Sequence, residues 1–526
     1  MSTLLPRNVL KYNYPKKRRT LDMRNIKVDI NAKKGKLDRY FSKCIGAGRA
    51  AEVMRHEAYK QLCTVQEECP FEYIRFHGLF HDEMGLVAQR ENGTLFNQYR
   101  ENDGTLMYNY QYVDMLFDSL LEIGLRPLVE IGLMPGELRS GDTSVFWWKM
   151  FNTAPADYAK WEHFIESFVR HITNRYGEEE IKKWYFEVWN EPDLESFFHS
   201  DDRMNEYFKI YESTARAIKR VNADYKVGGP ATAGLRWINE TVSFCRENDV
   251  PLDFISGHYY CVRGDFDPDG KRTLYMMPHE YFTGMVNKVG RECHAEGYPL
   301  LLTEWSASYS SRDRVHDSYF SAPFILHAIK SCEGSADMFS YWVYTDIFEE
   351  VGIGQEPFHG GFGLINIQSL KKPAFYAYKM LHALGDDELA CDDKNAYVCR
   401  GEDEVQVLFW NTVIPDQSSN NHNNVCFAKA TPSKQIENAT VTLSGFEANK
   451  TYSATIETVG YKMGDVYNAY LDMNLTDTPT REETKALAEA SKPKIVTFDV
   501  TANGNGIIEF TLPQTENQVD MIKIKI

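Results

Sequence analysis

Residues 184–192 read Trp-Tyr-Phe-Glu-Val-Trp-Asn-Glu-Pro, an apolar run that ends in polar residues. The run predicts a buried strand that delivers Asn190 and Glu191 at its carboxyl end, and Pro192 stops the strand. Residues 300–305, Leu-Leu-Leu-Thr-Glu-Trp, repeat this pattern and include Glu304 at the end of the apolar run. Both segments are therefore predicted strands that carry a glutamate at the same end.

Six further apolar runs surround these two and alternate with stretches of helical periodicity. The eight strand candidates are Cys44–Gly46, Tyr73–Phe76, Arg126–Ile131, Tyr185–Trp189, Lys226–Gly229, Phe254–His258, Leu300–Glu304 and Met338–Tyr344. Between them apolar residues recur at helical spacing, as in the stripe of Trp161, Phe164 and Phe168. Eight strands, each followed by a helix, predict an α/β fold, a (β/α)₈ TIM barrel, with a doubly wound sheet as the alternative.

The pattern changes after about Gly385. Shorter runs with alternating polarity follow, bounded by Asn, Gly, Pro and Asp, and they predict a C-terminal antiparallel β-sandwich. Thr480 and Glu483 form a capping box that opens one helix within it. We expect an N-terminal tail at 1–22, a segment at 23–43 whose strand is a candidate to pair with the sandwich, a catalytic barrel at 44–384 and an accessory sandwich at 385–526.

Composition excludes several classes of function. The 526 residues carry 58 basic and 75 acidic side chains, a net charge of −17, which argues against nucleic acid or an anionic membrane as the partner. No window approaches the roughly 20 apolar residues of a membrane span. The ten cysteines are scattered without a CxxC pair, as expected of buried small apolar residues.

The N-terminal basic run, residues 16–19, is not followed by the apolar stretch of a signal peptide. We expect a cytoplasmic protein, or a periplasmic or secreted one if a signal peptide has been removed.

The two strand-end glutamates indicate a chemistry. Glu191 and Glu304 end the predicted fourth and seventh strands, which lie across the barrel mouth from each other, where TIM barrels carry their active sites. Two facing carboxyl groups suffice for glycoside hydrolysis: one protonates the leaving oxygen, and the other attacks the anomeric carbon or activates water. A separation of about 5–5.5 Å would mean retention of configuration, and roughly 6.5–9.5 Å inversion.

With these residues in place the chain resembles glycoside hydrolase family 39, which includes β-xylosidases and α-L-iduronidases, and it is most similar to the bacterial β-xylosidases. The resemblance covers nearly the whole length. Besides Asn190-Glu191 and Glu304, the motifs that carry it are Cys44–Glu52, Tyr73–Gly78, Arg126–Pro135, His258–Tyr260, Tyr341-Trp342, Asp346–Glu350 and Gly360–Leu364.

The resemblance implies retention by double displacement, with Glu191 as acid/base and Glu304 as nucleophile. Asn190 would hydrogen-bond the sugar 2-hydroxyl. Trp342 would form the floor of the subsite that holds the sugar being released, and Glu349 would accept hydrogen bonds from its hydroxyls.

Further residues implied by the resemblance surround that subsite, and one of them is expected to orient Glu304. They are Arg75, His77, His258 and Tyr260, with Tyr309 as an additional substrate-binding residue. Two departures from the β-xylosidase pattern, Leu133 and Gly257, lead us to expect an enlarged pocket that could admit a sugar other than xylose.

The favoured function is therefore an exo-acting β-D-xylosidase that releases xylose from xylo-oligosaccharides or other β-xylosides. The alternative is a retaining enzyme of the same family that acts on an α-L-iduronide, α-L-arabinoside, β-galactoside or β-glucoside. No metal and no organic cofactor is implied, the substrate is the expected partner, and a homo-oligomer stays open.

Three remote alternatives rest on other features. Gly46 and Gly48 match a loose dinucleotide-binding fingerprint, which would make the protein an NAD(P)-dependent oxidoreductase. His77 and His81, beside Asp82 and Glu83, could suggest a metal site, although no HExxH motif is present. The third is a carbohydrate-binding protein that has lost catalysis.

Overall fold

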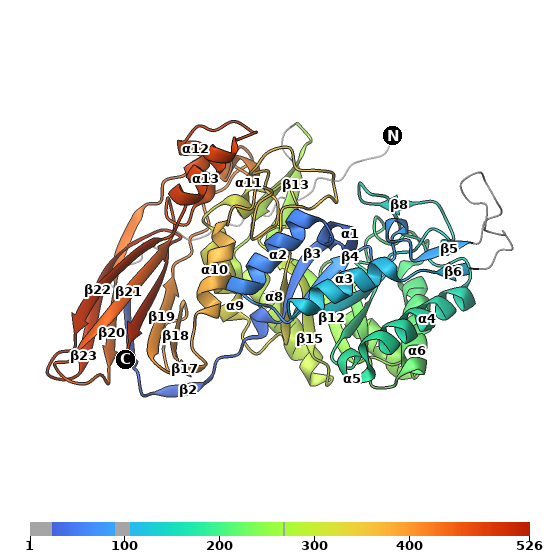
Figure 1. Ribbon diagram of the computed structural model, residues 1–526, viewed down its shortest axis with the longest axis horizontal. Coiled ribbons are helices and arrows are strands. Elements are labelled where there is room, and N and C mark those ends of the chain that lie inside the picture. Colours follow the sequence, from blue (N-terminus) through green and yellow to red (C-terminus); the bar gives the residue numbers. More distant parts are fainter. Residues whose placement is uncertain (1–23, 90–105, 267–268) are drawn as a thin grey trace, which may run out of the picture.

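The computed structural model describes residues 24–89, 106–266 and 269–526, so the predicted tail at 1–22 and its basic run lie outside the described residues. Two parts lie side by side: a barrel wrapped by helices, and a twisted pair of sheets that carries most of the C-terminal residues (Figure 1). Among the described helices none has the length and apolar character needed to cross a membrane.

The barrel is closed by eight parallel strands, as predicted. In chain order they are β3 (Cys44–Arg49), β4 (Tyr73–His77), β7 (Arg126–Ile131), β10 (Tyr185–Val188), β11 (Lys226–Thr232), β12 (Phe254–Tyr260), β15 (Leu300–Ser306) and β16 (Met338–Tyr341). Each strand pairs with the next, and β16 pairs with β3 to close the ring. Nearly all their side chains are buried, because the barrel interior lies on one side and the helices on the other.

One long helix follows each barrel strand and packs its apolar stripe on the barrel. These are α2 (His56–Glu68), α3 (Gln111–Glu122), α4 (Tyr158–Tyr176), α6 (Arg203–Val221), α7 (Ile238–Glu247), α8 (His279–Ala295), α9 (Ser321–Ser331) and α10 (Pro373–His382). In α4 the predicted stripe of Trp161, Phe164 and Phe168 is fully buried. The side chain of Asp157 caps that helix by accepting from two backbone N–H groups of its first turn.

Shorter elements fill the loops of the barrel. They are α1 (Ala50–Val53), α5 (Glu178–Ile181), β5 (Val87–Gln89), β6 (Leu106–Tyr108), β8 (Ser144–Val145), β9 (Met150–Phe151), β13 (Val262–Phe266) and β14 (Arg272–Met276). The last two form an antiparallel hairpin directly after β12, so they extend from the mouth of the barrel.

The C-terminal part is a β-sandwich with one seven-stranded and one three-stranded sheet. The first runs in the order β2 (Lys33–Lys36), β17 (Asp387–Leu389), β18 (Ala396–Arg400), β19 (Glu404–Trp410), β24 (Val519–Lys525), β21 (Thr451–Val459) and β22 (Lys494–Thr501). The second contains β1 (Arg24–Asp29), β20 (Gln435–Ser444) and β23 (Ile507–Thr515). Their inner faces share one apolar core that includes Ile26, Val407 and Val441.

Three helices accompany these sheets: α11 (Asn423–Cys426), α12 (Val466–Asp472) and α13 (Arg481–Ala490). The capping box of Thr480 and Glu483 begins α13, as the sequence indicates. The early strand β1 pairs with β20, and this pair is parallel although the sandwich was expected to be antiparallel. β1 precedes the barrel and β20 follows it, so no hairpin turn joins the two strands. They can therefore run in the same direction.

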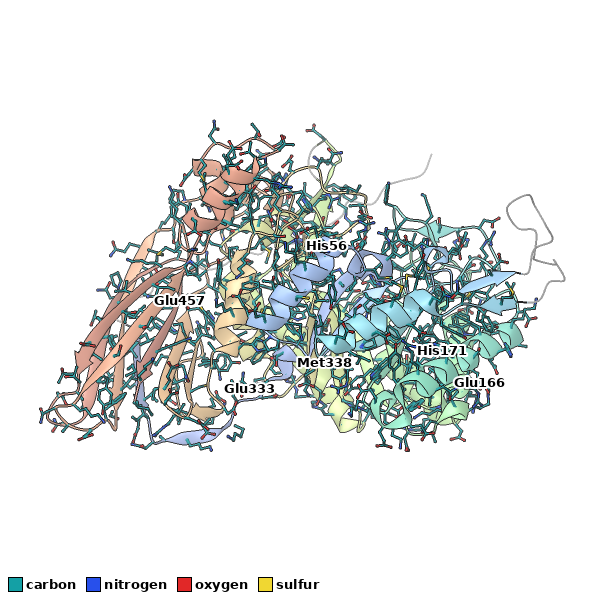
Figure 2. The ribbon with its side chains drawn as sticks, in the orientation of Figure 1. His56, Glu166, His171, Glu333, Met338 and Glu457 are labelled. Atoms are coloured by element: carbon teal, nitrogen blue, oxygen red, sulfur yellow. The ribbon has the colours of Figure 1, made fainter. Side chains whose placement is uncertain are left out.

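A partly exposed ion-pair network joins the barrel to the sandwich. Glu333, which follows α9, lies between the barrel and β2 (Figure 2) and pairs with Lys34 at 3.1 Å and with Lys330 at 3.1 Å. Both lysines also reach Glu388 on β17, at 2.9 and 2.7 Å. None of the ten cysteines forms a disulfide, and eight of them are buried.

Candidate active site

A cavity of about 430 Å³ opens at the carboxyl ends of the barrel strands, and Glu191 and Glu304 both line it. Its walls come from loops that follow six different barrel strands, as in TIM-barrel enzymes generally. The lining residues are His77, Asn190, Glu191, Leu194, Ser196, Phe197, Ala233, Arg236, Tyr260, Arg272, Glu304, Tyr309, Trp342, Glu350 and Phe362.

A tight turn after β10 directs Glu191 into this cavity. Trp189 and Glu191 both have positive φ, 72° and 47°, which side-chain-bearing residues rarely adopt. The neighbouring strands hold the turn, because the backbone N–H of Trp189 donates to the carbonyl of Ile131 and that of Glu191 to the carbonyl of Ala231, both at 2.9 Å. The strained backbone is therefore fixed from both sides.

Two donors hold the Glu304 carboxylate from opposite sides. Arg75 Nη1 on β4 donates to Oε1 at 2.7 Å, and the Tyr260 hydroxyl on β12 donates to Oε2 at 2.8 Å. Glu304 is 4% exposed, and the Arg75 guanidinium is completely buried. One oxygen thus faces a permanent cation and the other a neutral hydroxyl, an arrangement that stabilises the ionised form of the carboxyl.

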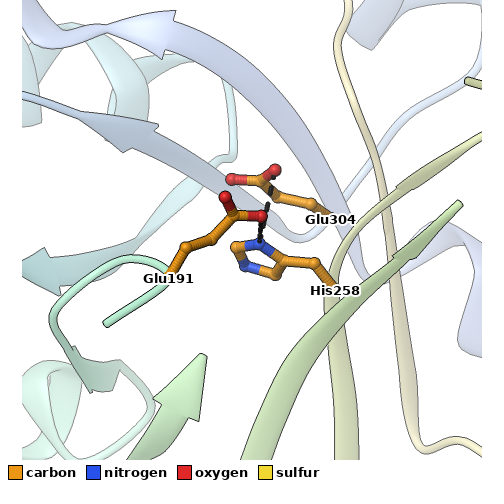
Figure 3. A group of neighbouring side chains, drawn as sticks. All are labelled: Glu191, His258 and Glu304. Carbon is orange, nitrogen blue, oxygen red and sulfur yellow. Dashed lines mark hydrogen bonds and ion pairs between the residues drawn. The ribbon is translucent and has the colours of Figure 1, made fainter. Parts of the chain in front are cut away.

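His258 lies between the two carboxyl groups. Its Nδ1 is 2.9 Å from Glu191 Oε1 and 3.4 Å from Glu304 Oε2, and the dashed lines of Figure 3 join it to both. Burial, with Arg75 and His77 nearby, lowers the pKa of His258 well below its ordinary value, so the imidazole is neutral. Its single proton can therefore be shared with only one carboxylate at a time.

The two carboxyl groups differ in their affinity for a proton. Burial, with Glu304 and Asp193 nearby, raises the pKa of Glu191 well above its usual range. Burial also raises the pKa of Glu304, to about 7, but Arg75 and His77 oppose the shift. The proton therefore resides on Glu191 while Glu304 ionises first, which is the division of roles that an acid and a nucleophile require.

A second layer of charged residues lies beneath the two glutamates. Arg75 also donates to Glu187 at 2.5 Å and contacts Glu130 at 3.0 Å, and Thr303 donates to the other oxygen of Glu187 at 2.7 Å. Because Arg75 serves Glu130, Glu187 and Glu304 together, its charge is divided among three carboxylates. The sequence contains no signal that Glu130 and Glu187 share Arg75 with Glu304.

His77 belongs to the same layer. Its Nδ1 is 2.7 Å from Glu130, and its Nε2 is 3.7 Å from Glu304 and 3.6 Å from Glu350. Although burial opposes it, Glu130 raises the pKa of His77 to about 10, so the ring carries a positive charge. A second cation therefore faces the base of the cavity.

The structure brings nine of the ten predicted site residues together around Glu304. Asn190 Oδ1 accepts from Arg75 at 2.9 Å, and the Trp342 ring lies 4.8 Å from that of His77 at the base of the cavity. Tyr309 lies further out, with its ring 6.3 Å from that of Tyr260.

Glu349 does not join this group. Its carboxylate pairs with Arg49 at 2.9 Å and with Arg55 at 2.5 Å, and its neighbour Glu350 lines the cavity instead. Both glutamates stand in a loop without regular periodicity, so nothing in the sequence indicates which of the two faces inward.

Neither Leu133 nor Gly257 contributes to the lining of the cavity among the described residues. Leu133 is fully buried in the barrel core. A Cβ on Gly257 would lie 2.8 Å from Leu235 Cδ2, so Leu235 already fills the space beside this glycine. The expected enlargement of the pocket is therefore not seen at either position.

Two of the rival features receive structural explanations. A Cβ on Gly46 would collide with Trp342, and one on Gly48 with Glu52, so both glycines make room for side chains of the barrel. His81 contacts Glu83 at 3.1 Å while His77 contacts Glu130, so the two histidines have different partners. Glu191, His258 and Glu304 present donor atoms within 4.8 Å of one another, a spacing that a cation could bridge.

Comparison with known proteins places these features in a family. The model of the family described as Glycosyl hydrolases family 39 matches residues 24–506. A β-xylosidase of Caldicellulosiruptor saccharolyticus is 35% identical over 95% of this chain and 98% of its own, and one of Geobacillus stearothermophilus is 33% identical over 96% of each. The crystal structure of a monomeric β-xylosidase from Caulobacter crescentus CB15 has a TM-score of 0.88 at 35% identity, covering 95% of this chain and 99% of that chain.

Proposed function

Since this chain belongs to glycosyl hydrolases family 39 and is a glycoside hydrolase, we propose that it is an exo-acting β-D-xylosidase that retains anomeric configuration by double displacement. The barrel is its catalytic domain and the sandwich an accessory domain. The preference for xylose is supported by the two β-xylosidases that resemble the chain over nearly its full length. The substrate class is xylo-oligosaccharides and other β-xylosides.

One observation carries the mechanism: one oxygen of Glu191 and one oxygen of Glu304 lie within 4.8 Å of each other, and His258 Nδ1 contacts both carboxyl groups. Retaining glycosidases hold their two carboxyl groups about 5–5.5 Å apart, whereas inverting enzymes need roughly 6.5–9.5 Å to admit a water between them. Two carboxyl groups that approach this closely and share His258 leave little room for a water between them, which supports direct attack by one carboxylate.

In the first step a Glu304 oxygen attacks the anomeric carbon from the face opposite the aglycone. The bond from that carbon to the glycosidic oxygen breaks, and Glu191 gives its proton to the departing oxygen, so a xylosyl ester of Glu304 forms. In the second step the Glu191 carboxylate takes a proton from water, the water oxygen attacks the same carbon, and Glu304 leaves as a carboxylate. Two inversions give net retention.

The remaining side chains orient these two groups and the sugar. Arg75 and Tyr260 hold Glu304 in its ionised form. The Asn190 carbonyl oxygen is occupied by Arg75, which leaves the amide N–H₂ to donate to the sugar 2-hydroxyl. Glu350 and Trp342 bound the base of the cavity, where they would contact the other hydroxyls and the apolar face of xylose.

The test is hydrolysis of 4-nitrophenyl β-D-xyloside beside the α-L-arabinoside, β-galactoside, β-glucoside and α-L-iduronide analogues, with NMR detection of the anomer that appears first. We expect the xyloside to be the best substrate and β-xylose to form first. Release of α-xylose first would overturn double displacement. Faster cleavage of another glycoside would keep the mechanism and overturn the choice of sugar.

Trapping the ester tests the nucleophile independently. A 2-deoxy-2-fluoro-β-xyloside with a good leaving group should stop turnover after one step, because the fluorine slows both steps and the leaving group rescues only the first. Mass spectrometry of the digested enzyme should then find the fluorosugar on the peptide that contains Glu304. A label on another carboxylate would reject the assignment.

A further inference from the structure

The mouth of the cavity carries an arginine that contacts a tyrosine. Arg272 begins β14 and lines the cavity, and its Nη2 donates to the Tyr309 hydroxyl at 2.8 Å. The guanidinium carbon lies 5.4 Å from the centre of the Tyr309 ring. Within the described residues, no carboxylate forms an ion pair with Arg272; one of its five N–H donors goes to the neutral Tyr309 hydroxyl, and the other four remain for a ligand.

The hairpin is shaped around this pair of residues. Gly264 on β13 lies next to them, and a Cβ there would come 3.1 Å from the Tyr309 hydroxyl and 3.5 Å from Arg272 Nε. A larger residue would therefore crowd the Tyr309 hydroxyl, which accepts from Arg272. Tyr309 in turn packs edge-on against Tyr260, which donates to Glu304. A continuous path of packed side chains thus connects Arg272 to the reacting carboxylate.

Arg272 belongs to the part of the cavity wall that comes from the segments after β10, β11 and β12, the part that also carries Glu191. Glu191, which must protonate the leaving oxygen, follows β10, and the next two strands round the barrel, β11 and β12, precede Arg236 and the hairpin. Trp342 and Glu350 follow β16 and bound the other side. Arg236 differs from Arg272 because Asp193 already neutralises it at 2.6 Å.

The Arg272 guanidinium and the Tyr309 hydroxyl are arranged as in a site that binds a carboxylate. An arginine presents two parallel N–H groups that match the two oxygens of a carboxylate, and a tyrosine hydroxyl beside it adds a third polar contact. Elsewhere the protein repels anions, since its net charge is −17 and three glutamates line the same cavity. Among the described residues that line the cavity, Arg272 is the cation without a carboxylate partner, and it therefore selects where a negative group can be held.

We propose that Arg272 and Tyr309 form a leaving-group subsite for a sugar carboxylate, so that acidic xylo-oligosaccharides carrying a hexuronic acid on the aglycone side are preferred substrates. The proposal rests on the proposed β-xylosidase function and specifies its substrate class. The hexuronic acid would sit on the xylose next to the one released, with its carboxylate on the Arg272 guanidinium.

The experiment compares three substrates built on the same xylotriose: the plain trisaccharide, the tetrasaccharide with glucuronic acid on its middle xylose, and the methyl ester of that acid. The ester has the shape of the acid without its charge. We expect kcat/KM for the acid to exceed that for the ester about tenfold, as for one exposed charge-assisted hydrogen bond. The difference should shrink in high salt.

Two variants test the assignment. Arg272→Gln should abolish the acid-to-ester preference, whatever it does to the plain sugar. Arg263→Gln is the matched control, because Arg263 lies on the same hairpin and is exposed but faces Asp265 at 3.8 Å instead of lining the cavity. It should keep the preference.

Equal rates for acid and ester in the unchanged enzyme would overturn the subsite, as would a preference that survives in Arg272→Gln. Failure of the proposed function is distinguishable, because it would appear as no release of xylose from plain xylotriose or from 4-nitrophenyl β-D-xyloside.

Discussion

Two buried clusters of ionised residues lie in this barrel. Both combine one cation with several carboxylates, but one stabilises loops and the other belongs to the candidate active site. One centres on Lys372, which donates to Asp317 at 3.0 Å, to Asp346 at 3.0 Å and to the carbonyl of Gly361 at 2.7 Å. The other centres on Arg75, which contacts Glu130, Glu187 and Glu304. In both, a fully buried cation is shared among several acceptors.

The clusters differ in whether the protein itself supplies all the hydrogen-bond donors that their carboxylates can accept from. In the Lys372 cluster, backbone N–H groups of Gly360 and Gly363 complete the hydrogen bonds of the two aspartates, at 2.7 and 2.6 Å. In the Arg75 cluster, Glu304 and Asn190 line the cavity and keep capacity for a ligand. We call the Lys372 cluster closed, because its hydrogen bonds are all made within the protein and hold loops together. We call the Arg75 cluster open, because its carboxylates remain available to a substrate.

The largest expected effect is on activity in the open cluster. Glu304→Gln keeps the size and polarity of the side chain but removes the nucleophile, so kcat for 4-nitrophenyl β-D-xyloside should fall by about 10⁴-fold or more. Asp317→Asn in the closed cluster is the comparison, and its folded fraction should turn over at the normal rate. Glu304→Gln activity within tenfold of the unchanged enzyme would contradict the distinction between the clusters.

The next effect is on stability in the closed cluster. Lys372→Met leaves two buried carboxylates without their cation, which should cost about 3–5 kcal/mol of unfolding free energy. Thermal and urea unfolding measure this loss. Lys330→Met is the matched control at the partly exposed junction between barrel and sandwich, where Lys34 still reaches the same two glutamates. An equal loss of unfolding free energy in Lys330→Met would show that the stability does not depend on whether the cluster is closed.

A smaller effect should reveal how the second layer tunes the open cluster. Glu187→Gln removes a negative charge that competes for Arg75, so Glu304 receives more of the cation and its pKa should fall. The acidic limb of the pH profile of kcat/KM should move down by about one unit, because Glu304 must be ionised to attack. Glu388→Gln, outside the barrel interior, should leave that limb in place, and an unmoved limb in Glu187→Gln would argue for a purely structural role.

The smallest effect separates Glu191 from Glu349 through the pH dependence of stability. Burial holds the proton on Glu191 in the fold after the unfolded chain has released it, so this residue costs stability as pH rises above its ordinary value of 4.5. The free energy of unfolding of Glu191→Gln should therefore rise relative to that of the unchanged enzyme as pH increases, by on the order of 1 kcal/mol near neutrality.

Glu349→Gln should behave in the opposite way. Although burial opposes it, Arg55 and Arg49 lower the pKa of Glu349, so its stabilising contribution is present above the ordinary value and lost as pH falls. The free energy of unfolding of this variant should therefore fall relative to that of the unchanged enzyme as pH rises. Melting temperatures from pH 2.5 to pH 8 measure both slopes, that of Glu349→Gln below about pH 5 and that of Glu191→Gln above it, and slopes of the same sign would reject the contrast.

Much of the fold and the centre of the site could be predicted from local pattern. All eight barrel strands were expected within a few residues of where they begin and end, because a buried parallel strand is a short apolar run and needs no knowledge of its partners. In the sandwich, β19 to β23 were expected from the runs Val405–Trp410, Ala439–Leu443, Tyr452–Thr458, Ile495–Val500 and Gly506–Leu512, whereas β2, β17, β18 and β24 were not anticipated. The first three are short, and the last follows β23 after a turn that carries no glycine or proline.

Local pattern also placed Glu191 and Glu304 together, because the ends of parallel strands in a barrel necessarily meet at one rim. Three features have no local signature: the sharing of Arg75, the inward position of Glu350 beside Glu349, and the contact of Arg272 with Tyr309. They depend on contacts between residues far apart in the chain, such as the 229 positions that separate Arg75 from Glu304. Periodicity records which residues are buried, but only closure of the barrel determines which buried charges share a partner.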